Sequence, residues 1–130
     1  MKGTRTVLND PEGRFEEELP LDRATHQCLV EAVLAWKGDP ALATADYEQI
    51  ALLLTGAARS VAGDLQRSAA RLPKDHQALA PADVVLEEAE RRLASPLEGT
   101  ARCAQDRARL VRTLYERLDR LTKTFPVPVP

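Results

Sequence analysis

The fold of this chain is decided by residues 47–72, which read YEQIALLLTGAARSVAGDLQRSAARL. Apolar and small residues recur in this stretch every three or four positions, which is the spacing of one face of an α-helix. That face consists of Tyr47, Ile50, Leu54, Ala57, Val61, Leu65, Ser68 and Leu72. The pattern predicts one uninterrupted helix about 40 Å long.

A second line of residues runs along the same predicted helix and is turned away from the first. It consists of Leu52, Gly56, Arg59 and Gly63. A helix with apolar or small residues on two faces packs against two neighbours. A glycine inside a helix costs up to about 1 kcal/mol relative to alanine, so close approach of another backbone is one reason to keep Gly56 and Gly63, and neutral drift is the other. We expect the first face to pack within the chain and the second to meet another subunit or a partner.

Composition and charge limit the class of protein. The chain has 130 residues, 44% of them hydrophobic, which suits one domain with one core. Its net charge of -2 gives no overall field that favours nucleic acid or an anionic membrane. The longest apolar run is far shorter than the roughly 20 residues needed to span a bilayer. The two cysteines, Cys28 and Cys103, and the lack of a signal-like segment at the start favour a reduced, cytoplasmic setting.

Turn and capping signals predict four helices, over residues 22–37, 44–72, 81–94 and 100–124. Asp22, Thr44 and Thr100 are the expected N-caps, and Gly38 is the expected left-handed residue that closes the first helix. Residues 1–20 are interpreted as a mobile or docking arm, 21–125 as the helical domain, and 126–130 as an extended Pro-rich tail. We therefore predict an all-α, four-helix bundle-like single domain with one long central helix.

The relative lengths of these helices bear on assembly. The first and third predicted helices are each about half as long as the second, so each follows only half of it. The fourth would run along the third and extend past it, leaving part of its apolar face uncovered. A twofold partner is the commonest way to cover such a face, so we expect a homodimer, and a compact monomer with oblique crossings is the alternative. The expected interface residues are Leu52, Gly56, Gly63, Leu114, Leu118 and Leu121.

Residues with catalytic or metal-binding chemistry are few. His26 and His76 are the only histidines, and neither stands in a metal-ligand pattern, so we expect no metal and no cofactor. Cys103 lies in the first turn of the fourth predicted helix, where the helix dipole favours a thiolate. His26 and Cys103 are therefore the catalytic candidates, but burial of Cys28 and Cys103 as small apolar residues is enough to explain both cysteines.

The fourth predicted helix carries seven basic residues: Arg102, Arg107, Arg109, Arg112, Arg117, Arg120 and Lys123. They are spread around the helix without the interleaved aromatic residues typical of single-strand binding, so nucleic acid is a disfavoured partner. An acidic protein segment or an anionic ligand is favoured instead. We expect Tyr47, Arg109, Arg112 and Tyr115 to contact a ligand or partner. In the third helix, Glu87 with Arg91 and Glu88 with Arg92 have the spacing of ion pairs on an exposed face.

Several segments together resemble a known family: Leu54, Thr55 and Gly56, residues 65–73 (LQRSAARLP), residues 88–93 (EAERRL) and residues 109–112 (RLVR). Over about residues 45–122 the chain resembles short actinobacterial proteins labelled natural product biosynthesis proteins, whose function is largely unassigned. Members often have a histidine just after the glycine, and a proline with a glutamate farther along, where this chain has Ala57, Gly63 and Asp64. The resemblance implies a small helical protein associated with antibiotic-type biosynthesis.

Three functional hypotheses remain open at this point. The first is a helical accessory protein that binds or organises a peptide, a carrier or another protein, through the basic fourth helix and a groove beside the long helix. The second is a substrate-organising tailoring enzyme, for example one that forms lanthipeptide cross-links, since holding a substrate in a reactive shape needs few catalytic side chains. The third is a DNA-binding regulator, whose affinity would fall steeply with salt.

Overall fold

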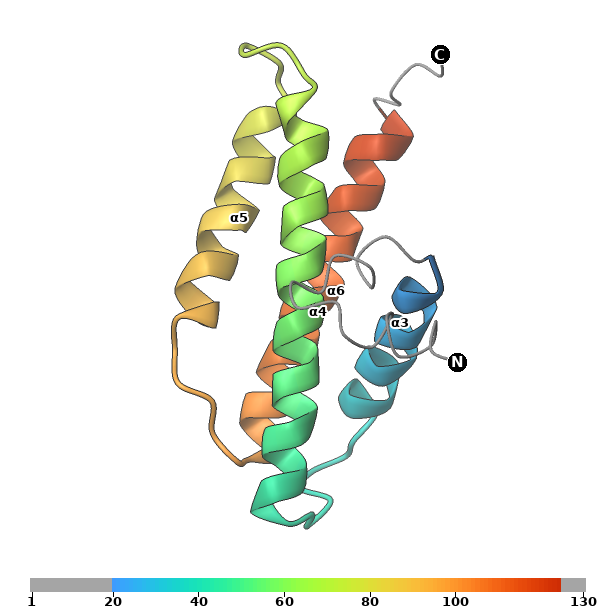
Figure 1. Ribbon diagram of the computed structural model, residues 1–130, viewed down its shortest axis with the longest axis vertical. Helices are drawn as coiled ribbons and strands as arrows, with labels where there is room; N and C mark the ends of the chain where they lie inside the picture. The colour runs from blue at the N-terminus through green and yellow to red at the C-terminus, as the bar shows by residue number, and fades with distance from the viewer. Residues whose placement is uncertain (1–19, 125–130) are drawn as a thin grey trace, which may run out of the picture.

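The computed structural model describes residues 20–124, and these form four α-helices (Figure 1). The helices are α3 (Pro20–Leu34), α4 (Thr44–Ala70), α5 (Leu79–Leu93) and α6 (Ala101–Thr124). No strand occurs in this part of the chain. The predicted all-α, four-helix fold with one long central helix is therefore confirmed. The predicted arm before Pro20 and the Pro-rich tail lie outside the described residues.

Successive helices alternate in direction, so α4 and α6 run parallel to each other (Figure 1). α4 stands at the centre of the view, with α5 on one side, α3 on the other and α6 behind it. α4 and α6 have similar lengths, 27 and 24 residues, whereas α3 and α5 have 15 each. α6 therefore runs along α4. The sequence had suggested that α6 would extend past a shorter neighbour, and it does not.

The core lies mainly between α4 and α6 and is closed by α3 and α5. Its largest fully buried side chains are Leu54, Leu65, Leu114, Val33, Val61 and Val111. Alanines of α4 and α6 with almost no exposed surface allow the two helices to approach closely: Ala51, Ala58, Ala104 and Ala108. The first face predicted for the long helix is thus the buried one.

The same core covers the residues of α6 that were expected to need a second subunit. Leu114 and Leu121 are 0% and 4% exposed, and Leu118 is half-buried against the core cluster. Their own chain covers them because α4 matches α6 in length. The reason for expecting these three residues at a dimer interface therefore does not hold.

Helix ends agree with the predicted caps at only one of three positions. Thr100 caps α6, because its Oγ1 accepts a hydrogen bond from the N–H of Cys103 at 3.1 Å. Asp22 lies inside α3, and Ala43 takes the N-cap position that had been assigned to Thr44. Gly38 has the expected positive φ of 103°, but α3 ends at Leu34, so Gly38 lies within the following loop.

The connection from α5 to α6 passes very close to the start of α4. A Cβ placed on Gly99 would overlap the methyl group of Thr44 and lie 2.8 Å from the Thr44 carbonyl oxygen. Only glycine fits such an approach without a shift of the backbone. This contact anchors the 94–100 connection against α4, beyond the end of α5.

Candidate functional site

A groove with a volume of about 730 Å³ lies between α4 and α5. Ligand-binding clefts commonly fall within about 300–1,000 Å³. Its apolar lining residues come from both helices and from the connection between them: Ala62, Ala69, Ala70, Leu72, Leu79, Leu86, Ala89 and Leu93. We call this cavity the α4/α5 groove.

The two edges of the α4/α5 groove carry opposite charges. Exposed Arg59 lies on the α4 edge, and exposed Lys74 lines the end where the two helices connect. The α5 edge is acidic, with the exposed residues Asp83, Glu87 and Glu90. A guest with separated charges would therefore have one preferred orientation in the groove.

The second face predicted for the long helix forms the α4 wall of this groove. Arg59 and Gly63 line it, and Gly56 and Leu52 continue the same face toward the start of α4. Leu52 is 53% exposed, and a Cβ on Gly56 would meet nothing within 4 Å. A Cβ on Gly63 would meet only the Arg67 side chain, at 3.5 Å. Within the described residues, no backbone approaches either glycine closely, so this face is open.

The structure places His26 beside Tyr115, between α3 and α6. His26 Nδ1 lies 3.0 Å from the Tyr115 hydroxyl, and the Arg23 guanidinium stands 4.4 Å from the centre of the Tyr115 ring. Arg23 also forms an ion pair with Asp119 at 2.6 Å. Tyr115 is buried, so this cluster joins α3 to α6 and presents little of the tyrosine to a ligand.

The two catalytic candidates do not share a site. His26 contacts Tyr115, whereas Cys103 lies twelve residues earlier on α6, which is about 18 Å along a helix axis. A histidine that activates a thiol must lie within hydrogen-bond reach of it. The structure therefore gives no support to His26 and Cys103 as one catalytic pair.

Tyr47 is buried at the start of α4 and fixes the loop that precedes it. Its hydroxyl donates to Asp39 Oδ1 and accepts the N–H of Leu42 at 3.0 Å. Asp39 Oδ1 also accepts the N–H of Ala41 at 2.7 Å, and the Trp36 ring packs edge-on against Tyr47. These contacts explain how the loop is held after α3 has ended.

The same contacts shift two pKa values. The hydrogen bond from Tyr47 lowers the pKa of Asp39 below its ordinary value, and the bond from the Ala41 N–H adds to this effect. Burial raises the pKa of Tyr47, and its bond to Asp39 raises it further. Tyr47 thus has a structural role that its placement as a ligand-binding candidate did not anticipate.

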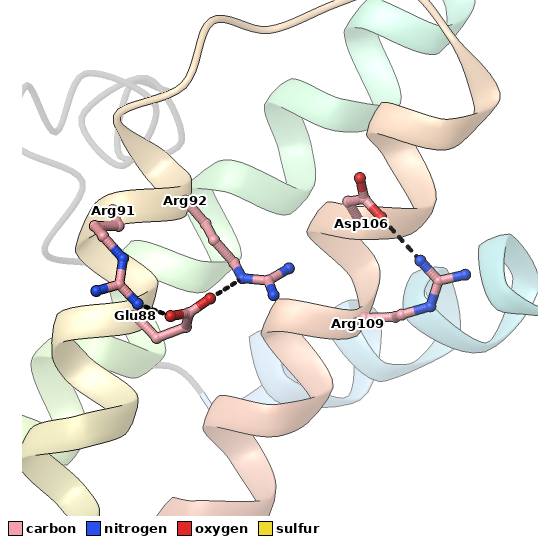
Figure 2. A network of polar contacts seen from close by, with 5 residues as sticks. All are labelled: Glu88, Arg91, Arg92, Asp106 and Arg109. Atoms are coloured by element: carbon pink, nitrogen blue, oxygen red, sulfur yellow. Dashed lines mark hydrogen bonds and ion pairs between the residues drawn. The ribbon is translucent and has the colours of Figure 1, made fainter.

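Some exposed charges of α5 and α6 form ion pairs within their own helix (Figure 2). Glu88 binds both Arg91 and Arg92, the latter at 2.5 Å, while Asp106 binds Arg109 at 2.9 Å. The predicted Glu88–Arg92 pair is confirmed, and Arg91 pairs with Glu88 in place of Glu87. Exposed pairs of this kind contribute little to stability, about 0–1 kcal/mol each.

Other classes of site receive no support from the described residues. They contain no group of three or more histidine, cysteine or acidic residues that could hold a metal ion. None of their helices combines the length and apolar character needed to cross a membrane. Comparison of the chain with models of known protein families, with curated proteins and with solved structures finds no match. Function must therefore be inferred from the geometry of the chain itself.

Proposed function

We propose that this protein is a small helical accessory protein that binds an amphipathic helical segment of a peptide, carrier or protein partner in the α4/α5 groove. The observation that supports this proposal is the apolar groove of about 730 Å³ with an acidic α5 edge and Arg59 on the α4 edge. Apolar grooves between helices commonly take up the apolar face of a guest helix. The link to natural-product biosynthesis rests on the family resemblance and makes a pathway peptide or carrier the partner of interest.

The shape and charge of the α4/α5 groove define the guest. Its apolar lining calls for a helix with large apolar residues three and four positions apart. Its acidic edge at Asp83, Glu87 and Glu90 calls for basic residues on the side of the guest that faces α5. Gly63 lets a guest side chain lie against the α4 backbone, because no Cβ stands in the way.

Two labelled helical peptides test the proposal by fluorescence anisotropy. Both carry the same apolar face, and they differ only in having lysines or glutamates on the edge that would face α5. We expect the lysine peptide to bind at least about tenfold more tightly, since one or two close charge contacts supply a difference of that order. Equal binding of the two peptides, or binding of neither, would refute the proposed groove specificity.

A pair of matched variants locates the binding. Gly63→Leu places a side chain into the α4/α5 groove, whereas Ala24→Leu adds the same side chain at an exposed position of α3. The first should weaken binding of the lysine peptide strongly, and the second should leave it unchanged. Unchanged binding in Gly63→Leu would place the peptide outside the α4/α5 groove.

A homodimer through the open face of α4 is a second candidate arrangement. It is favoured by the neighbouring residues Leu52 and Leu53, which are 53% and 52% exposed, and by the open position at Gly56. Light scattering at micromolar concentration should then give twice the chain mass, and Leu52→Asp should reduce it to the monomer mass. A monomer in the unmodified protein would exclude this arrangement.

A further inference from the structure

A second, smaller pocket lies where the connection after α5 meets the first turns of α6. Its volume is about 190 Å³, and its lining includes Ser95, Cys103 and Arg107. It is separate from the α4/α5 groove, since it lies between other segments and shares none of the groove's lining residues. We call it the Arg107 pocket.

The guanidinium of Arg107 is buried at the wall of this pocket with one nitrogen unsatisfied. Arg107 is only 5% exposed, and its Nη2 donates to the Ser95 carbonyl oxygen at 2.8 Å. Its Nη1 is buried and has no hydrogen-bond partner among the described residues. Arginine stays charged in proteins, and a buried charged donor without an acceptor is costly. A ligand that brings an anionic oxygen would remove this cost.

Cys103 lies at the same pocket, one helical turn before Arg107. Residues four apart lie on the same side of a helix, so the thiol and the guanidinium both belong to the wall of α6 that lines the pocket. The Cys103 Sγ accepts the N–H of Glu98 at 3.4 Å, which ties the sulfur to the connection after α5. The pocket thus combines a thiol and an unsatisfied cationic donor.

The other charges around the pocket narrow the class of ligand. Arg92 and Asp106 also line the pocket, and both form ion pairs: Arg92 Nε binds Glu88 at 2.5 Å, and Asp106 binds Arg109 at 2.9 Å. Glu98 and Asp106 also line the pocket, and their negative charges disfavour a dianion such as phosphate. A volume of about 190 Å³ admits only a small molecule. A compact monocarboxylate meets all these conditions.

We propose that the Arg107 pocket binds a small monocarboxylate through Arg107 Nη1 and holds it beside the Cys103 thiol. Thiol-reactive molecules that carry a carboxylate are then directed to Cys103. This site is independent of the proposed peptide groove, so either proposal can fail without the other.

Selective alkylation tests the proposal with Cys28 as an internal control. Iodoacetate and iodoacetamide react identically in outline: the sulfur forms a bond to the CH₂ carbon, iodide leaves, and the thiol proton passes to solvent. Only iodoacetate carries a carboxylate. Cys28 is exposed on α3, and trypsin releases it in a peptide separate from that of Cys103, so mass spectrometry follows both rates in one sample.

The measured quantity is the iodoacetate rate divided by the iodoacetamide rate at each cysteine. This quotient cancels differences in general accessibility between exposed Cys28 and half-buried Cys103. We expect it to be about fivefold larger at Cys103, the size of one close charge contact. Arg107→Met should bring it down to the Cys28 value, whereas Arg120→Met, at an exposed arginine of the same helix, should not.

A protection measurement on the unmodified protein keeps the test independent of any variant that fails to fold. Sodium propionate should slow the iodoacetamide reaction of Cys103 but not of Cys28, relative to sodium chloride at equal ionic strength. Equal quotients at the two cysteines, or a lack of protection by propionate, would overturn the proposal.

Discussion

The two apolar faces of α4 differ sharply in what covers them. On one face Leu54, Val61 and Leu65 are at most 1% exposed and belong to the core shared with α6. On the other face Leu52 is 53% exposed, and Gly56 has open space where a Cβ would stand. The difference arises because α6 matches α4 in length and packs against it, whereas α5 has only 15 residues and faces α4 across the α4/α5 groove. Apolar residues on a helix face therefore show that a neighbour is favoured, and the lengths of the other helices decide whether the chain supplies it.

The largest expected effect comes from the covered face. Leu65→Ala should lower the free energy of unfolding by about 2–5 kcal/mol, because it leaves a cavity in a fully buried position. Leu52→Ala is the matched control on the open face and should change it by less than about 0.5 kcal/mol in the monomer. Urea unfolding followed by circular dichroism measures both. Equal losses would mean that the open face is covered in solution.

The contact that holds the α5–α6 connection gives the next largest effect. Gly99→Ala forces a methyl group against Thr44 and should cost about 1–3 kcal/mol of unfolding free energy. The double variant Gly99→Ala with Thr44→Ser should recover part of the loss, because it removes the Thr44 methyl but keeps the nearby carbonyl. Thermal unfolding of the three proteins distinguishes these outcomes, and a neutral Gly99→Ala would show that the connection does not lie against α4.

Tyr47→Phe tests how the start of α4 is fixed and should produce a loss of stability that depends on pH. The pKa of Asp39 is lowered in the folded state, so its contribution to stability is present above about pH 4 and is lost as the pH falls through the folded-state pKa. Removing the Tyr47 hydroxyl should lower the Tm at pH 7 and make the variant less sensitive to acid than the unmodified protein. Melting curves between pH 7 and pH 2.5 measure this, and a constant Tm difference would exclude the proposed role of Asp39.

The smallest expected effect is a gain in stability. Gly56→Ala should stabilise the isolated chain by up to about 1 kcal/mol, since alanine favours the helix and the added Cβ meets nothing within 4 Å. If a partner backbone approaches Gly56, the same substitution should weaken that association. Unfolding and light scattering of the variant report the two effects separately, and a loss of stability without any change in assembly would show that Gly56 is not on an open face.

Much of the fold could be predicted from sequence periodicity, whereas the packing partner of α6 could not. The spacing of Leu54, Val61 and Leu65 identified the buried face of α4 correctly, because helical period and burial are directly linked. Periodicity does not show which helix a face meets, and so α6 was placed along α5. The observed limits around α4 differ from the predicted ones by a few residues. The loop before α4 is fixed by Tyr47 and its hydrogen bonds and not by a capping side chain.

The candidate sites could likewise be predicted only in part from the sequence. Arg59 and Gly63 were correctly singled out on the second face of α4, but the α5 wall of the groove was missed because it depends on how two helices are spaced. Arg107 was listed only as one of seven basic residues spread around the fourth helix, although its position three after Ala104 and four before Val111 places it on the buried side of α6. That spacing was the available signal.

The most direct test of a binding function for the open face of α4 is an amide chemical-shift titration with the lysine-edged helical peptide. We predict that the chemical-shift changes concentrate in residues 59–72 and 79–93, on both walls of the α4/α5 groove, and that the amide resonances of α3 and α6 do not shift. Shifts centred on α3 and α6, or a spectrum unchanged by excess peptide, would contradict it.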